Sequence, residues 1–126
     1  MSLTSSRRKA FLSQGGLCFY CRCPMWLGKQ PPGTPRGLQC TAEHLLPRSE
    51  GGSNEPDNIV AACRTCNPRR HRRPKPMAVE RYAVHVARAM AKARWHSMGV
   101  QQFLRSRNLW PSALGSDKAL KTVPGR

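Results

Sequence analysis

Apolar residues along the chain gather into short runs, and stretches rich in proline and glycine separate these runs. Two of the runs, residues 38–43 and 58–61, have the length of short strands. The segment between them holds Pro47 and a Gly-Gly pair, which favour a wide turn. Before the first run, residues 28–37 contain three prolines and three glycines, which predict an exposed loop. The pattern thus predicts two neighbouring strands joined by a turn.

Helices are predicted on both sides of the strands. Residues 7–14 predict a short helix, with Ser5 or Ser6 as its cap and the two glycines that follow as its end. A second helix is expected to begin at residues 63–67, directly after the second strand. Pro68 is tolerated there because the amides in the first turn of a helix have no intrahelical partner.

The C-terminal half predicts a basic helical extension over residues 77–107. Apolar side chains recur at helical spacing over residues 77–98, Gly99 is expected to end this helix, and a short helix follows up to residue 107. The longer helix either covers the core or enters a groove of nucleic acid. Residues 111–126 are expected to form a loosely ordered tail. Residues 1–126 together suit a single domain of the α+β class.

The charge of the chain narrows the choice of partners. Twenty-two lysines and arginines stand against six acidic residues, and the net charge of +16 makes nucleic acid the expected partner. A charge that only aids solubility and an anionic membrane surface are the alternatives. No apolar run approaches the roughly 18 residues of a membrane span, so no membrane partner is expected. The N-terminal segment lacks the apolar stretch of a signal peptide, which predicts an intracellular, cytoplasmic protein.

Six cysteines bear on the stability of a chain that is only 39% hydrophobic and poor in aromatic residues. Four of them form two Cys-x-x-Cys pairs: Cys18, Cys21, Cys63 and Cys66. Their thiolates suit one tetrahedral zinc ion with a structural role. Cys23 is an alternative to Cys21 as a ligand, and Cys40 suits an apolar position on a strand. Three disulfides are the rival interpretation, which a reducing cytosol disfavours.

A second group of residues suits phosphodiester cleavage, which needs a base for the attacking water and positive charge against the transition state. His44 can accept a proton near neutral pH. Glu43 and Asn67 can offer oxygen atoms to a hard divalent cation. His71 lies one helical turn after Asn67 and can face the same ion or the scissile phosphate. Adjacent residues on a strand point to opposite faces, so Glu43 and His44 converge only where the strand ends or bends.

Two segments carry a resemblance to a known family. Residues 41–52 are TAEHLLPRSEGG, and residues 57–67 are DNIVAACRTCN. Together with both cysteine pairs, they strongly resemble the HNH endonucleases over roughly residues 11–73. The resemblance implies the ββα-metal fold, also called the His-Me finger, reinforced by structural zinc and flanked here by N-terminal and C-terminal helices.

The resemblance also implies a role for each site residue. His44 resembles the general base, Asn58 the residue that braces the loop and helps to orient that histidine, and Glu43 and Asn67 the ligands of a catalytic Mg²⁺ or Mn²⁺ ion. Two positions depart from the commoner pattern. Glu43 stands where Asp or His is more frequent, and Asn67 stands where His is frequent, which makes this an H-N-N variant. In-line attack is expected to leave 5′-phosphate and 3′-hydroxyl ends.

Arginines surround the predicted site and are expected to hold the phosphate backbone of DNA. They are Arg48, Arg69, Arg70, Arg72 and Arg73. The expected function is therefore a metal-dependent HNH endonuclease that hydrolyses phosphodiester bonds in DNA. A non-catalytic zinc-knuckle protein that binds nucleic acid is the alternative. Cutting both strands with one site per chain favours a homodimer or successive nicks.

Overall fold

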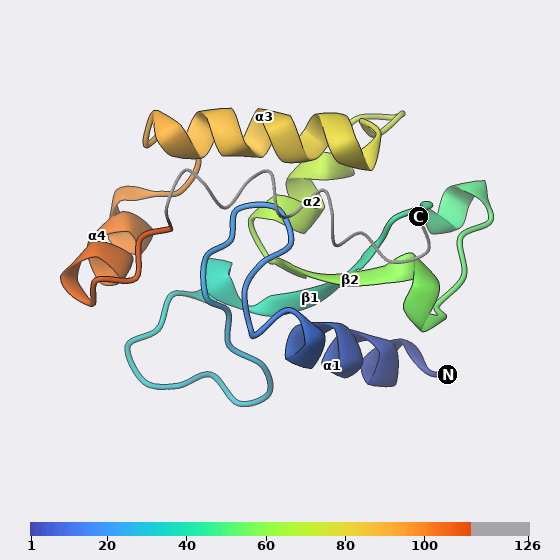
Figure 1. The fold of residues 1–126 in the computed structure, drawn as a ribbon, viewed down its shortest axis with the longest axis horizontal. Helices are drawn as coiled ribbons and strands as arrows, with labels where there is room; N and C mark the ends of the chain where they lie inside the picture. Colours follow the sequence, from blue (N-terminus) through green and yellow to red (C-terminus); the bar gives the residue numbers. More distant parts are fainter. Residues whose placement is uncertain (112–126) are drawn as a thin grey trace.

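The structure, a computed structural model that describes residues 1–111, places a small sheet among helices (Figure 1). Its helices and strands are α1 (Leu3–Ser13), β1 (Cys40–His44), β2 (Ile59–Cys63), α2 (Cys66–Arg70), α3 (Val79–Ala91) and α4 (Met98–Ser106). The predicted α+β class is confirmed, and β1, β2 and α2 form the ββα unit. The tail predicted over residues 111–126 lies outside the described residues, apart from Pro111.

The two strands pair as an antiparallel hairpin in which Cys40 lies opposite Cys63 and His44 lies opposite Ile59. All five residues of β2 are buried. The first strand was predicted to begin at residue 38, but β1 begins at Cys40, because Leu38 closes a 3₁₀ turn by donating its amide to the carbonyl of Pro35. At its other end, β1 stops at His44, where the chain turns into the loop.

Helix α1 packs against both strands, on the side of the sheet away from α3 (Figure 1). It begins at Leu3, a turn earlier than predicted, because the side chain of Ser2 accepts the amide of Ser5. Ser6, predicted as a possible cap, is buried and donates to the carbonyl of Asn54 at 2.7 Å. The helix is thereby tied to the loop between the strands.

Gln14, just after α1, covers the outer edge of β2. Its Nε2 donates to the carbonyl of Ala61 at 2.9 Å, and its Oε1 accepts the amide of Ala61 at 2.8 Å. The amide of Phe19, in the first cysteine turn, also donates to the carbonyl of Ala61, at 2.9 Å. An edge strand that would otherwise expose backbone groups is therefore satisfied by a side chain and a turn.

The boundary between the two C-terminal helices differs from the predicted boundary. The helix expected over residues 77–98 ends at Ala91, and Ala93 then adopts a left-handed conformation with φ 53°. Gly99, expected as a breaker, lies in the first turn of α4, which begins there because the side chain of Ser97 accepts the amide of Val100. A side-chain cap thus decides the boundary, and glycine is tolerated next to it.

Helix α3 covers the core. Its buried face comprises Val79, Tyr82, Ala83, Val86 and Met90. The ring of Tyr82 meets the ring of Tyr20 edge to face, with centroids 4.8 Å apart, and so joins α3 to the first cysteine turn. Of the two roles that the sequence leaves open for this helix, the structure shows core packing. None of the helices within residues 1–111 has the length and apolar character needed to span a membrane.

Candidate metal centre and active site

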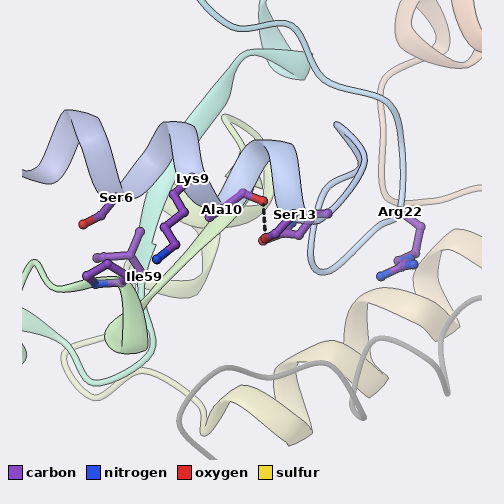
Figure 2. A pocket seen from close by; sticks show the side chains of 8 residues that line it. Ser6, Lys9, Ala10, Ser13, Arg22 and Ile59 are labelled. Carbon is purple, nitrogen blue, oxygen red and sulfur yellow. Dashed lines mark hydrogen bonds between the residues drawn. The ribbon is translucent and has the colours of Figure 1, made fainter.

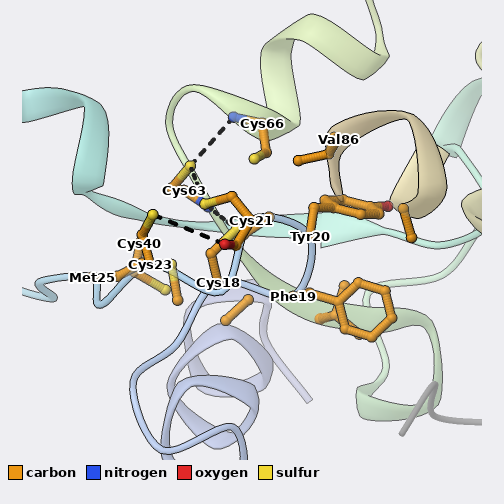
Figure 3. Close-up of a cluster of buried hydrophobic side chains, with 14 of the residues drawn as sticks. Cys18, Phe19, Tyr20, Cys21, Cys23, Met25, Cys40, Cys63, Cys66 and Val86 are labelled. Carbon is orange, nitrogen blue, oxygen red and sulfur yellow. Dashed lines mark hydrogen bonds between the residues drawn. The ribbon is translucent and has the colours of Figure 1, made fainter. Parts of the chain in front are cut away.

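The two cysteine pairs meet in the core (Figure 3). The sulfur atoms of Cys18, Cys21, Cys63 and Cys66 all lie within 4.8 Å of one another, and all four residues are buried. The sulfurs of Cys21 and Cys63 are 3.9 Å apart. Tetrahedral zinc with Zn–S bonds of about 2.3 Å requires a sulfur separation of about 3.8 Å. The cluster therefore has the donor atoms and the spacing of a closed zinc site.

Four thiols this close do not titrate independently. Burial opposes ionisation, but hydrogen bonds from the Cys21, Cys63 and Cys66 thiols hold the pKa of Cys18 well below its usual value. Burial and the neighbouring Cys18 raise the pKa values of Cys21 and Cys66 well above theirs. Burial and mutual contacts thus couple the ionisation of these thiols, and a bound cation favours the thiolate form of all four.

The two remaining cysteines lie outside this group of four. Burial raises the pKa of Cys40 to about 12, so that its thiol stays protonated, which suits the apolar strand position predicted for it. The sulfur of Cys23 lies near Cys21 and His96, and Cys21 rather than Cys23 completes the cluster of four. All six cysteines lie in the described part of the chain, and none forms a disulfide.

A hollow of about 410 Å³ opens beside the end of β1. It is lined by Ala42, His44, Pro47, Arg48, Ser49, Asn67 and His71. His44 reaches it from the last position of β1, and its Nε2 lies 2.9 Å from Oδ1 of Asn54. Since that amide oxygen can only accept, Nε2 carries the proton and Nδ1 is left with a free lone pair. Asn54 has no place in the sequence prediction, because nothing in its local spacing marks it.

Asn58 holds the loop that follows His44. Its Oδ1 accepts the amide of Leu46 at 2.8 Å, and its Nδ2 donates to the carbonyls of Leu46 and Ser53 at 3.1 and 2.8 Å. A Cβ on Gly52 would lie 1.7 Å from the carbonyl oxygen of Leu46, so only glycine fits there. Asn58 therefore makes the contacts of a loop brace, while the contact to His44 comes from Asn54.

Glu43 points away from solvent into a polar network and is 0% exposed. Its Oε2 accepts from the hydroxyl of Tyr20 at 2.8 Å and from Arg70 at 3.1 Å. Its Oε1 lies 2.7 Å from Nε2 of His71. Burial first, and then the charge of Glu43, raise the pKa of Tyr20 well above its usual value, so this hydroxyl remains a donor. Oε2 is thus held by two buried donors, and Oε1 faces His71, a residue that lines the hollow.

Arg70 corrects one of the predictions. The sequence predicts that it binds phosphate, but it is only 4% exposed. Besides Glu43, its guanidinium donates to the carbonyls of His44, Leu45 and Met77. The carboxylate and the three carbonyls together occupy four of the five guanidinium N–H groups, so Arg70 serves the interior rather than a phosphate group.

Asn67 lies in the first turn of α2 and lines the hollow. Its Nδ2 donates to Oγ1 of Thr41 at 3.0 Å and to the carbonyl of Ala42 at 2.9 Å. Both contacts use the amide nitrogen, so the carbonyl oxygen is the group that remains for a cation. The side chain of His71 is 30% exposed and closes the same side of the hollow.

The arginines around α2 differ in exposure. Arg48, Arg72 and Arg73 are exposed. Arg69 is half-buried: it donates to the carbonyl of Trp95 at 2.6 Å, and its guanidinium carbon lies 4.7 Å above the Trp95 ring. Together with Arg72 and Arg73, it lines a second hollow of about 230 Å³ between α2 and α3. A third hollow of about 400 Å³, beside α1, has Lys9 and Arg22 in its wall (Figure 2).

The two regions have donors for metal ions of different hardness. Four sulfurs suit zinc, whereas the carboxylate of Glu43 and the amide oxygen of Asn67 suit a hard divalent ion such as Mg²⁺ or Mn²⁺, beside which the imidazole of His71 is a softer nitrogen donor. Glu43 is 0% exposed, and its Oε1 becomes available to an ion only when the side chain of His71 turns aside. The cysteine cluster therefore fits the predicted zinc as it stands, and Glu43 completes the second donor set only after that movement.

Comparison with known proteins bears on both regions. A family model described as HNH endonuclease matches residues 18–73 of this chain. The matched segment begins at the first cysteine of the cluster and includes both strands, α2 and the arginines that follow it. Neither the curated proteins nor the solved structures gave a match.

Proposed function

We propose that the chain hydrolyses phosphodiester bonds in DNA with the hollow beside His44 as its active site, because a family model described as HNH endonuclease matches residues 18–73. The observation that carries the proposal is the joint position of His44, Asn67 and His71 around one hollow at the end of β1. An imidazole base and ligand groups for a cation thus face the same space, and arginine flanks it.

His44 acts as the general base. Asn54 holds its Nε2–H at 2.9 Å, which leaves Nδ1 to take the proton of a water molecule. Asn58 acts on His44 indirectly, because it fixes the loop from Leu46 to Ser53 through three hydrogen bonds. Asn54 therefore orients the base, and Asn58 holds the loop that frames the hollow.

Glu43, Asn67 and His71 hold the catalytic divalent ion. Such an ion, when bound, neutralises negative charge that develops on the phosphate. Tyr20 and Arg70 fix Oε2 of Glu43, and Oε1 becomes the oxygen for the ion when Nε2 of His71, now 2.7 Å from it, turns from the carboxylate to the ion. Asn67 offers its amide oxygen while its nitrogen remains bonded to β1.

The four clustered cysteines hold a structural zinc ion. A closed site of four sulfurs leaves no position for substrate, so zinc stabilises the fold and takes no part in the cleavage. Exposed Arg48, Arg72 and Arg73, with half-buried Arg69, hold the DNA phosphates. Binding strength is thereby separated from the chemistry at His44.

Nicking of supercoiled plasmid DNA tests the proposed function. With Mg²⁺ or Mn²⁺ present, the protein is expected to nick the plasmid, and His44→Ala is expected to reduce the rate by about 10²- to 10⁴-fold because the base is lost. DNA binding and thermal stability should remain. Gln102→Ala, exposed on α4, is the control and should cut like the wild type. DNA binding without metal-dependent cleavage by the wild type would instead establish the non-catalytic zinc-knuckle alternative.

A further inference from the structure

Two side chains of the loop between α3 and α4 reach the sulfurs of the cysteine cluster. Nε1 of Trp95 donates to the sulfur of Cys66 at 3.2 Å. Nε2 of His96 lies 3.3 Å from the sulfur of Cys21. Trp95 is 8% exposed and His96 is 5% exposed, so both contacts lie in the core. Both residues come from the C-terminal extension, outside the segment that the family model matches.

These contacts complete a set of hydrogen bonds to the cluster. The amide of Cys63 donates to the sulfur of Cys18, and the amide of Cys66 donates to the sulfur of Cys63, each at 3.3 Å. With the indole and imidazole contacts, every sulfur of the cluster has an N–H group beside it. A zinc ion with four thiolates carries a net negative charge, and buried charge needs such donors. The extension supplies the donors that the core lacks.

The ring of His96 is consistent with the role of donor. Its Nδ1 is buried and has no hydrogen-bond partner among the described residues. If Nδ1 carried the proton, a buried N–H would be left unsatisfied, whereas a proton on Nε2 points at the sulfur of Cys21. With the proton on Nε2, Nδ1 is left as a buried acceptor without a partner, which costs less free energy than a buried N–H without one.

The loop that carries the two donors is fixed in place. Nε2 of Gln101, a buried residue of α4, donates to the carbonyls of Ala93 and His96, each at 3.0 Å. The left-handed turn at Ala93 and the cap at Ser97 bound the loop on either side. Trp95 and His96 are therefore presented to the sulfurs from a braced loop rather than from an exposed one.

We propose that Trp95 and His96 are positioning residues of the zinc centre, through which zinc binding and docking of the C-terminal extension stabilise each other. The inference rests on the proposed structural zinc. The same contacts extend to the surface, since Arg69 donates to the carbonyl of Trp95 and lies over its ring. Zinc binding thereby also fixes a residue proposed to hold DNA phosphate.

The test uses the full chain and two measurements. Charge-transfer absorption of the Co²⁺-loaded protein reports on the thiolates, and transfer of Zn²⁺ to a chromogenic chelator reports on how firmly the ion is held. Trp95→Phe and His96→Leu remove one N–H donor each. Each is expected to move the sulfur-to-cobalt band to lower energy, because the thiolate lone pairs lose a donor, and to speed zinc release by about tenfold.

Two further variants separate a hydrogen bond from packing. His96→Gln keeps a donor near the position of Nε2 and is expected to restore both the band and the release rate of the wild type. Trp26→Phe removes an indole N–H that donates to the carbonyl of Pro35 at 3.0 Å, away from the cysteines, and should change neither measurement. The comparison with His96→Gln therefore tests the hydrogen bond even if His96→Leu loosens the packing of the core.

Each contrary outcome has its own meaning. If the wild type binds one zinc ion and neither Trp95→Phe nor His96→Leu changes the cobalt band, the inference is overturned while the zinc site stands. If the cobalt spectrum of the wild type shows three sulfurs and one nitrogen, His96 is a ligand, and its positioning role is overturned. If the wild type holds no zinc, the proposed structural zinc fails first, and the inference falls with it.

Discussion

The cysteine cluster and the hollow beside His44 both use the hairpin and α2, and the cluster adds the turn that carries Cys18 and Cys21, yet the two regions are organised in opposite ways. The cluster is fully buried, its members come from two tight turns, and all of its ligand atoms are alike. The hollow is half-exposed, takes residues from β1, from the loop after it and from α2 with its C-cap, and depends on polar contacts with neighbouring residues. The cysteine cluster is thus part of the core, and the hollow is a surface site whose side chains are held by buried residues.

This difference shows how stability and chemistry are divided. In the proposed zinc site, four sulfurs around one ion hold together segments that are 45 residues apart, and they leave no open position for substrate. At the hollow, in contrast, Nδ1 of His44 has no hydrogen-bond partner among residues 1–111, since such a group must be available to react. Mutations should therefore separate the two regions cleanly.

The largest effect is expected when the cluster loses a ligand. Cys66→Ser should abolish stoichiometric zinc and cooperative unfolding, because metal binding contributes on the order of 10 kcal/mol to the folding of small zinc domains. Metal analysis and urea unfolding measure this. Cys40→Ala, a buried cysteine outside the cluster, is the control and should keep one zinc ion per chain. A Cys66→Ser protein that retains a full complement of zinc would remove the contrast between the regions.

Next in size is the loss of the buried charge behind the hollow. Glu43→Gln should lower the free energy of unfolding by about 3 kcal/mol, since Arg70 is then buried without a carboxylate. Adding Arg70→Met should recover part of the loss, which a double-mutant cycle in urea would show. Glu50→Gln, exposed in the loop, is the control. A change below about 0.5 kcal/mol in Glu43→Gln would mean that the pair contributes little.

A smaller, purely catalytic effect is expected at Asn54. Asn54→Ala removes the oxygen that holds Nε2 of His44 and should slow single-turnover cleavage by up to about tenfold, the value of one hydrogen bond. The thermal midpoint and zinc content should stay close to those of the wild type. Asn54→Asp keeps an acceptor at this place and should preserve most of the rate. Equal rates for the alanine variant and the wild type would show that the orientation of His44 comes from elsewhere.

The smallest effect is expected on DNA binding by the exposed arginines. Replacing Arg72 and Arg73 by Gln should reduce the slope of the logarithm of the DNA-binding constant against the logarithm of the salt concentration by about 2. The rate at which bound DNA is cleaved should stay nearly unchanged. Titrations of labelled duplex at several salt concentrations measure the slope. Arg107→Gln, just beyond α4 and away from α2 (Figure 1), is the control. An unchanged slope in the double variant would place the DNA on another face.

Some elements followed from the sequence because their signals are local. The cysteine spacings predicted a four-sulfur cluster, and the two apolar runs predicted the hairpin, although β1 begins later than expected. The predicted length of the long C-terminal helix was wrong: α3 ends at Ala91, and α4 begins after the cap at Ser97. The loop between them is held by Gln101, which contacts the carbonyls of Ala93 and His96 only after folding. Such contacts lie beyond the reach of helical periodicity.

Charge along the chain does not tell which arginine faces solvent. Arg69, Arg70, Arg72 and Arg73 form one basic run, but only Arg70 meets the carboxylate of Glu43 and the carbonyls at the end of β1. The direction of α2 against the hairpin decides this, and that direction is a property of packing. The same holds for Asn54, which contacts His44 because the loop folds back.

By itself, the sequence determined the paired cysteines, the hairpin, the basic character and the residues that resemble an HNH motif, since each of these depends on neighbours within a few positions or on composition. The tertiary structure alone decided that Arg70 supports Glu43 from the interior, that Asn54 holds His44, and that Trp95 and His96 lie against the cysteine sulfurs. The physical reason is that these partners come from elements far apart in the chain. Which side chains meet is fixed only when helices and strands pack and buried polar groups find their hydrogen bonds.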